Sequence, residues 1–348
     1  MTLLNRAVYI ILFLLTNLSF SFGQVAQKNL ATRMDSLFDA KASNPFNGAI
    51  LISMEGKIIY SRANGYSNFA TKEKLRLDQQ FIIGSISKQI TAVLVLLQFE
   101  KGSLRLNEPI ASYLPELKPS WADTITVHQL LTHTHGITSL NKLLLFKPGT
   151  QFSYSQIGYE LLASILENVS GKTFRSLCDE LFESCNMKNS TTLDSKKDTP
   201  MIGYSQTSNG EYKVEKEGLR YPVPAAGVIS TAPDLVLWNN KLHSGNLLSD
   251  RSYNIMITKQ KNARRKHPIF GLTDYGYGIT VSDLGKTSQL GLTGLVPGFV
   301  SMDFYYPSNR VSVIVLENVA ASGDDLHKKF YYHLQVLKLV KDSHLINK

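Results

Sequence analysis

Helical and strand-like patterns of apolar residues occupy different parts of this chain. Near the N-terminus, apolar residues recur at helical spacing over residues 26–41, and two β-prone runs follow at residues 48–53 and 57–63. The turn sequence Met54-Glu55-Gly56 separates these runs and predicts a hairpin. A long apolar helix is expected over residues 86–101, because a glycine follows directly and would end it.

The middle of the chain has a mainly helical pattern, and strand patterns return near the C-terminus. Helices separated by polar loops are expected at residues 127–132, 159–169 and 173–183. Strands are expected at residues 277–282, 298–305 and 311–317. A final helix carries one apolar stripe, formed by Leu326, Phe330, Leu334 and Leu337. The sequence contains no internal repeat.

This order of elements predicts an α+β fold of the α/β sandwich type. Strands from both ends would form one antiparallel sheet flanked by helices, with a mostly helical lobe inserted between them. We expect residues 24–102 and 275–348 to form the sheet domain, and residues 103–274 to form the inserted lobe. Binding sites in such chains tend to lie in the cleft between the lobes.

Residues 1–23 have the pattern of a secretory signal peptide. Arg6 precedes an apolar run of about ten residues, whereas a bilayer-spanning helix needs about twenty. Ser21 and Gly23 supply the small residues expected just before a cleavage site at Gln24. We therefore expect export to the periplasm or the extracellular space of a bacterium, with no stable membrane anchor after cleavage. An uncleaved anchor is the alternative.

The composition is that of a sizeable globular protein. The chain has 348 residues, of which 43% are hydrophobic and 19% are charged, and this argues against disorder and against a polytopic membrane protein. The net charge of +9 becomes +8 once the segment with Arg6 is removed. Because no basic tail accompanies this charge, we expect no nucleic-acid partner. The basic cluster at residues 259–267 is interpreted as a solvated loop, and the oligomeric state stays open.

The cysteines and histidines give little support for metal or disulfide chemistry. Two cysteines cannot build a disulfide framework or a four-thiolate zinc site. If one helix held Cys178 and Cys185, their Cα atoms would be roughly 10 Å apart, too far for a disulfide. Free buried thiols are therefore favoured, although a bond becomes possible if the helix ends before Cys185. His128, His133 and His135 lie near one another without acidic residues, so we expect no metal and no cofactor.

Ser85 and Lys88 form a Ser-x-x-Lys pattern at the start of the long apolar helix. Residues three apart share one helix face, so the Lys88 ammonium can lie beside the Ser85 hydroxyl. The helix N-terminus adds a positive end and backbone N–H donors, which favour an alkoxide. Ser139 and Lys142 match the same pattern, but they lie in a loop after Gly136 and lack this context.

Two further segments carry candidate chemistry. Tyr154 lies between a turn and a helix, where its phenol could project into a cleft and, next to a lysine, act as a base. A core tyrosine is the simpler reading of this residue alone. The glycine-rich segment 291–299 would allow a substrate to approach a strand edge closely, and an exposed N–H there could help to form an oxyanion hole. Its simpler reading is a β-hairpin.

Together and in this order, the three segments resemble the serine β-lactamase and penicillin-binding protein superfamily, and within it the class C β-lactamase-related serine hydrolases. The resemblance extends over nearly the whole chain after residue 23 and includes residues 81–91, 130–137 and 225–235. It implies that Ser85 is the nucleophile, that Lys88 helps to take its proton, and that Tyr154 is the general base. It also implies an oxyanion hole formed by the backbone N–H groups of Ser85 and Leu295.

The chain departs from the family pattern at two positions. Position 156, usually Asn, is Gln156, whose amide donor could still reach Lys88 or a substrate amide. Position 292, usually Lys or His, is Leu292, which removes a partner for a substrate carboxylate and a field that favours phenolate. Losing such a charge-assisted hydrogen bond costs about 1.5–3 kcal/mol. Tyr66 begins a Tyr-x-Asn sequence that matches more strictly, but it follows the first hairpin and is interpreted as a decoy.

The sequence thus predicts an exported serine hydrolase that acts through an acyl-enzyme on esters or amides, with a small-molecule or peptide substrate. Substrate-binding positions implied by the resemblance are Gln156, Leu292, Thr293 and Gly294. Efficient β-lactamase activity is not expected, and a Leu292→His variant should raise activity if the missing imidazole limits it. The alternative is a catalytically weakened relative that binds peptidoglycan fragments or a partner protein.

Overall fold

The computed structural model describes residues 28–39, 45–194, 201–207, 209–285 and 287–346, so the expected signal peptide lies outside the described residues. An eight-stranded sheet forms the centre, and every neighbouring pair of its strands is antiparallel. Its strands in spatial order are β10 (Arg264–His267), β11 (Gly271–Tyr275), β12 (Thr280–Leu284), β13 (Thr287–Val296), β14 (Phe299–Tyr306), β15 (Val311–Glu317), β1 (Gly48–Met54) and β2 (Lys57–Asn64). The two ends of the chain therefore meet in one sheet, as expected.

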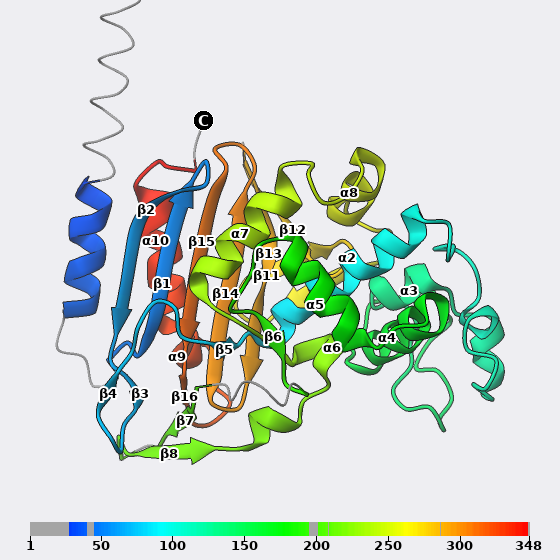
Figure 1. The fold of residues 1–348 in the computed structure, drawn as a ribbon, viewed down its shortest axis with the longest axis horizontal. Helices are drawn as coiled ribbons and strands as arrows, with labels where there is room; N and C mark the ends of the chain where they lie inside the picture. The colour runs from blue at the N-terminus through cyan, green and yellow to red at the C-terminus, as the bar shows by residue number, and fades with distance from the viewer. Residues whose placement is uncertain (1–27, 40–44, 195–200, 208, 286, 347–348) are drawn as a thin grey trace, which may run out of the picture.

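Helices cover both faces of this sheet. The helix of residues 28–39 and α10 (Tyr331–Asp342) pack on one face, and α7 (Ala232–His243) lies across the other (Figure 1). Alternate residues of β1 enter two different cores. Ala49 and Leu51 pack on the side of α7 and α2 (Ser87–Glu100), while Ile50 and Ile52 pack on the α10 side. A strand covered on both faces needs a continuous apolar run, and the sequence of β1 supplies one.

Most of the remaining helices gather beside the β11–β12 side of the sheet, whereas α9 directly precedes α10 (Figure 1). The labelled helices are α2 (Ser87–Glu100), α3 (Val127–Leu131), α4 (Ile157–Ser170), α5 (Phe174–Ser184), α6 (Val223–Ala226), α7 (Ala232–His243), α8 (Asp250–Ile257), α9 (Leu326–Lys329) and α10 (Tyr331–Asp342). Hydroxyl side chains cap the N-termini of α3, α5, α7 and α8 by accepting hydrogen bonds from backbone N–H groups; they are Thr126, Thr173, Thr231 and Ser249.

Short elements connect the sheet to the helices. The 3₁₀ turns are η1 (Gly84–Ile86), η2 (Ile110–Ser112), η3 (Ser120–Asp123) and η4 (Glu217–Arg220). Three small sheets contain β5 (Phe81–Ile82), β9 (Val228–Ser230) and β6 (Thr191–Thr192); β16 (Val319–Ala321), β7 (Gly203–Gln206) and β8 (Tyr212–Glu215); and β3 (Tyr66–Asn68) and β4 (Glu73–Lys74). The first of these sheets holds the chain just before η1 against the segment that leads into α7.

The expected fold class is confirmed, with one difference in the extent of the sheet. The sheet already begins at β10, so Arg264–His267 is an edge strand and not part of a solvated loop. The chain reverses between His267 and Gly271, so that β10 lies against β11 and pairs with it from Arg264 to His267. No helix among the described residues is long and apolar enough to span a membrane. Cys178 and Cys185 are both buried and free, as favoured from the sequence, although α5 ends at Ser184, just before Cys185.

Candidate functional site

Ser85 lies in the 3₁₀ turn η1, which runs directly into the N-terminus of α2. Ser87 fixes this turn from inside, because its hydroxyl donates to the Gly84 carbonyl oxygen at 2.7 Å and accepts from the Val228 N–H at 3.0 Å. The α2 helix behind the turn is buried on nearly all sides. The Ser85 side chain is therefore held on a rigid element, at the positive end of a long helix.

The Lys88 side chain is fully buried, and its ammonium group reaches back to Ser85. Nζ lies 3.5 Å from the Ser85 Oγ, and it donates at 2.8 Å to the Gln156 amide oxygen and at 2.8 Å to the Ala225 carbonyl oxygen. These contacts use the three donors of an ammonium group without any carboxylate. Burial, with a smaller contribution from the charge of Arg265, lowers the pKa of Lys88, while Tyr154 opposes the shift.

Gln156 occupies the position that precedes α4, so the start of that helix delivers its amide to Lys88. The contact with Lys88 was expected, but the amide oxygen makes it as an acceptor, whereas the sequence argument used the amide donor. The extra methylene relative to asparagine does not prevent a normal hydrogen bond to the ammonium.

Tyr154 brings its ring to the same place from the loop before α4. The Lys88 Nζ lies 4.7 Å from the centroid of the ring. The phenolic oxygen is buried and has no hydrogen-bond partner of ordinary geometry among the described residues. Burial alone would raise the pKa of Tyr154, but the charge of Lys88, the neighbouring Ser85 hydroxyl and the charge of Arg265 outweigh burial and lower it. Such contacts are often loose without a substrate and tighten when one binds.

The edge of β13 faces Ser85. β13 pairs with β12 only as far as Gly291, so the part beyond it has strand β14 on one side and an open edge on the other. Val296 and Phe299 flank a two-residue turn and form a hydrogen-bonded pair. Hydrogen-bonded and non-hydrogen-bonded pairs alternate along antiparallel strands, so the Leu295 N–H points away from β14. The approach to η1 is close, because a Cβ on Gly84 would lie 2.8 Å from the Leu295 nitrogen.

Glycine is required where β13 and η1 meet. A Cβ on Gly294 would lie 2.0 Å from the Ile83 carbonyl oxygen, and Gly84 itself has a φ of +55°. Ser301 on β14 donates to the same Ile83 carbonyl at 2.7 Å and fixes the strand against the turn. The backbone N–H groups of Ser85 and Leu295 thus lie on facing segments, as an oxyanion hole needs.

Leu292 and Thr293 lie farther along β13. The Leu292 side chain is only 2% exposed. Together with Thr293 it lines a small cavity that Arg265 of β10 also lines. A cation is therefore present in this region although position 292 does not supply it.

The histidine turn supports Tyr154 from one side. The His133 ring lies 4.4 Å from the Tyr154 ring, between centroids. The backbone of His133 accepts from the Ser153 N–H at 2.9 Å, and its Nδ1 accepts from the Ser155 N–H at 3.2 Å. Both flanks of Tyr154 are thereby fixed. Burial, assisted by the nearby charge of Lys88, keeps the pKa of His133 well below its usual value, so the ring is neutral.

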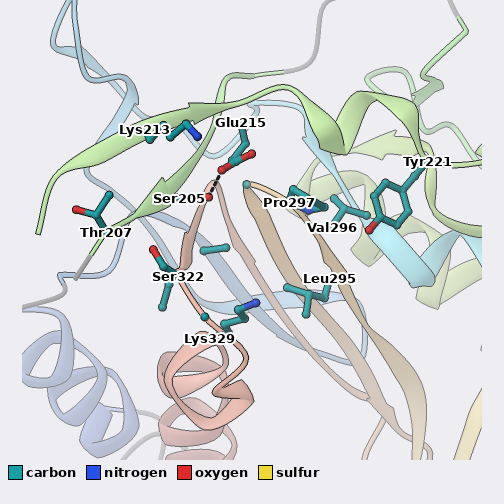
Figure 2. Close-up of a pocket in the computed structure, with 14 residues that line it drawn as sticks. Ser205, Thr207, Lys213, Glu215, Tyr221, Leu295, Val296, Pro297, Ser322 and Lys329 are labelled. Carbon is teal, nitrogen blue, oxygen red and sulfur yellow. Dashed lines mark hydrogen bonds between the residues drawn. The ribbon is translucent and has the colours of Figure 1, made fainter. Parts of the chain in front are cut away.

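A pocket of about 530 Å³ begins beyond Leu295, next to the turn between β13 and β14 (Figure 2). Lys213 and Glu215 of β8 line it on one side, and Lys329 of α9 lines it on the other. Neither Ser85, Lys88 nor Tyr154 lines this pocket, so it lies beside the cluster and not within it.

Two residues at this site, Arg265 and His133, are not identified from the sequence. Arg265 lies in the basic cluster interpreted as a solvated loop, although Arg264 to His267 alternate between more exposed and less exposed positions as a strand does. His133 is not distinguished in the sequence from the neighbouring histidines. Its φ of +57° marks a constrained turn, which the sequence signals only by the following Gly136.

The assembled groups can carry out nucleophilic acyl transfer. A serine hydroxyl, an ammonium group with lowered pKa, a phenol with lowered pKa and a close backbone N–H pair meet at one place. The Tyr66–Asn68 sequence forms a turn of its own, in which the Asn68 side chain accepts from the backbone N–H groups of Ala70 and Thr71.

Comparisons with known proteins give matches in both sequence and fold. The sequence matches the family described as Beta-lactamase over residues 36–338. It is 25% identical to esterase EstB of Burkholderia gladioli, over 86% of this chain and 83% of the esterase. Among solved structures, the octameric penicillin-binding protein homologue from Pyrococcus abyssi has a TM-score of 0.73 at 23% identity and covers 90% of this chain and 77% of its own. The D-amino acid amidase from Ochrobactrum anthropi SV3 complexed with D-phenylalanine has a TM-score of 0.77 at 19% identity and covers 90% of this chain and 99% of its own. These two structures share its fold.

Proposed function

This chain belongs to the beta-lactamase family and is an enzyme of the serine hydrolase type, and we propose that it cleaves esters or amides through an acyl-enzyme on Ser85. The observation that carries this proposal is the buried Lys88 ammonium, which contacts the Ser85 Oγ at 3.5 Å while its other donors are fixed by Gln156 and Ala225. Among the described residues Lys88 has no ion-pair partner, and its ammonium is instead directed at the Ser85 hydroxyl.

In the acylation step, the Tyr154 phenolate takes the proton from the Ser85 hydroxyl as Oγ attacks the carbonyl carbon of the substrate. Lys88 remains charged and stabilises the phenolate. The negative charge that forms on the carbonyl oxygen is stabilised by the N–H groups of Ser85 and Leu295. The tetrahedral intermediate then collapses, and the leaving group departs with the proton held by Tyr154.

In the deacylation step, Tyr154 takes a proton from a water molecule, which attacks the ester bond to Ser85. The product acid leaves, and the proton returns to the Ser85 oxygen. Thr293, Gly294 and Leu295 offer the open edge of β13 to the backbone or carbonyl of a bound substrate. Because Leu292 is apolar and buried, this edge does not place a cation at position 292 for a substrate carboxylate, and rapid β-lactam turnover is not expected.

We further propose that residues 1–23 direct export and that the mature chain begins at Gln24. Expression of the full chain in a bacterial host, followed by N-terminal sequencing of the protein recovered outside the cytoplasm, tests this. A recovered protein that retains Met1–Gly23 would contradict cleavage.

A fluorophosphonate probe tests the proposed activity most simply, because it reacts with an activated serine whatever the natural substrate is. The mature protein should be labelled and should hydrolyse short-chain esters, and Ser85→Ala should abolish both. Ser139→Ala is the matched control, since Ser139 has the same sequence pattern with Lys142, and it should leave labelling unchanged. Labelling that does not depend on Ser85, together with no ester turnover, would favour the alternative of a binding protein.

A further inference from the structure

Arg265 points into the candidate site from the edge strand β10. Its neighbour Arg264 lies on the opposite side of the strand, where it pairs with Asp274 at 2.8 Å and is largely exposed. The Arg265 guanidinium instead lies over the ring of Tyr154, with 4.5 Å between Cζ and the ring centroid. Alternation along one strand therefore sends two adjacent arginines to different environments.

Arg265 is not held there by a carboxylate. The nearby carboxylates pair with other cations: Lys259 forms ion pairs with Asp274 and Asp283, and Arg264 forms one with Asp274. Among the described residues, no acidic side chain lies within salt-bridge distance of either Arg265 or Lys88. The ring of Tyr154 is thus the shared neighbour of two cations, since the Lys88 Nζ is 4.7 Å from the same centroid.

Two cations near one buried ring repel each other, and a negative charge placed between them offsets this repulsion. The charges that act on Tyr154 come from Lys88 on α2 and Arg265 on β10, and both are positive. The other titratable groups packed around its ring are neutral: burial keeps the pKa of His133 well below its usual value, and burial raises the pKa values of Tyr159 and Tyr275 well above theirs. The Tyr154 phenol is the group in this cluster that can supply the negative charge.

We propose that Arg265 is a positioning residue that stabilises the anionic form of Tyr154 and so provides, from β10, the positive field that position 292 of this chain does not provide. The proposal rests on the proposed function, in which Tyr154 acts as the base. It assigns a purpose to a partly buried arginine that has no acidic partner among the residues the structure describes, and it explains how the tyrosine can act as a base although position 292 is apolar.

The test compares Arg265→Gln with Arg265→Lys, and uses Arg264→Gln as the matched control on the same strand. The rate of ester hydrolysis is measured against pH. Because Arg265 lowers the pKa values of both Tyr154 and Lys88, its removal should move both limbs of the profile to higher pH, by roughly one pH unit. Arg265→Lys should recover most of this shift, and Arg264→Gln should leave the profile in place.

A second readout does not depend on catalysis. The tyrosinate absorbance of Tyr154 is obtained as the difference between each protein and its Tyr154→Phe counterpart during a pH titration. Arg265→Gln should move this titration to higher pH even if the serine proves unreactive, so failure of the proposed function is distinguishable from failure of this proposal. An Arg265→Gln titration that superimposes on that of the wild type would overturn the proposal, as would an equal shift in Arg264→Gln.

Discussion

The close approach of η1 to β13 makes Gly84 the most informative single position to perturb. Gly84→Ala would place a Cβ 2.8 Å from the Leu295 nitrogen and 3.0 Å from the Gly294 Cα, whereas ordinary van der Waals contact begins at 3.4 Å. The turn and the strand must therefore separate by about 0.6 Å, because both atoms belong to the backbone and cannot rotate away. That separation widens the gap between the two N–H groups of the proposed oxyanion hole.

The effect on rate follows from the size of that displacement. Removal of one oxyanion-hole donor costs about 10²–10³ in kcat, and a misplacement of about 1 Å costs on the order of 10². We therefore expect Gly84→Ala to lose roughly 10- to 100-fold in kcat for a short-chain ester, and to react more slowly with a fluorophosphonate. The left-handed φ of +55° adds a stability cost of about 1–2 kcal/mol, which denaturant unfolding measures separately.

Gly102→Ala is the control for that backbone cost. Gly102 follows the other end of α2 and has a φ of +75°, but no atom lies within 4 Å of a Cβ added there. It should lose similar stability and keep full activity. If Gly84→Ala retains kcat within a factor of three of the wild type, or if Gly102→Ala loses activity equally, the oxyanion-hole argument is refuted.

Three further predictions concern the surroundings of the site. Gln156→Leu removes one acceptor from the buried Lys88 ammonium and should cost about 1.5–3 kcal/mol in denaturant unfolding, whereas Gln156→Asn, which keeps an amide, should cost less; equal costs would contradict the contact. Burial raises the pKa of Asp303 from 3.8 to about 7. The protonated carboxyl therefore contributes its full stability below pH 3.8, and roughly 4 kcal/mol of the free energy of unfolding is lost as the pH rises through 7. Unfolding of Asp303→Asn between pH 5 and pH 9 should accordingly vary less than that of the wild type, and an unchanged pH dependence would contradict this assignment. Because Cys178 and Cys185 are buried and free, a thiol reagent should react with them in the unfolded protein without added reductant, but not in the folded protein. No reaction in the unfolded protein would indicate a disulfide.

The fold was predictable because most of its helices and strands have a clear local pattern of apolar residues. The long helix α2 and strands β1, β14 and β15 combine strong apolar patterns with clear ends, and the structure places each within two residues of its expected bounds. Strand β10 was not predictable, because its more buried positions, Arg265 and His267, are not apolar and so give no strand signal in the sequence. Its pairing with β11 comes from the chain reversal at Gly271 and not from an apolar pattern.

The candidate site was predictable only where one segment carried its signal. Ser85 and Lys88 share a helix, so their spacing alone indicates that their side chains meet. The contacts of Arg265 and His133 with Tyr154 join segments far apart in sequence, and no local pattern encodes them. The expected consequence of Leu292 for Tyr154 changes as a result, because Arg265 supplies a positive charge in the region although position 292 does not. In a Leu292→His variant the imidazole would be buried in the cavity that Arg265 already lines. Because a cation is already present there, higher activity of this variant is no longer expected.

If Ser85 carries the acyl group during catalysis, mass spectrometry of the protein during ester turnover should detect the group there. Acid quenching of the wild type, followed by peptide mapping, should find the acyl mass on the peptide that contains Ser85. Tyr154→Phe should reach this adduct slowly and release it slowly, and Ser85→Ala should show none. Ester turnover without any adduct on Ser85, or an adduct on another residue that persists in Ser85→Ala, would contradict the account.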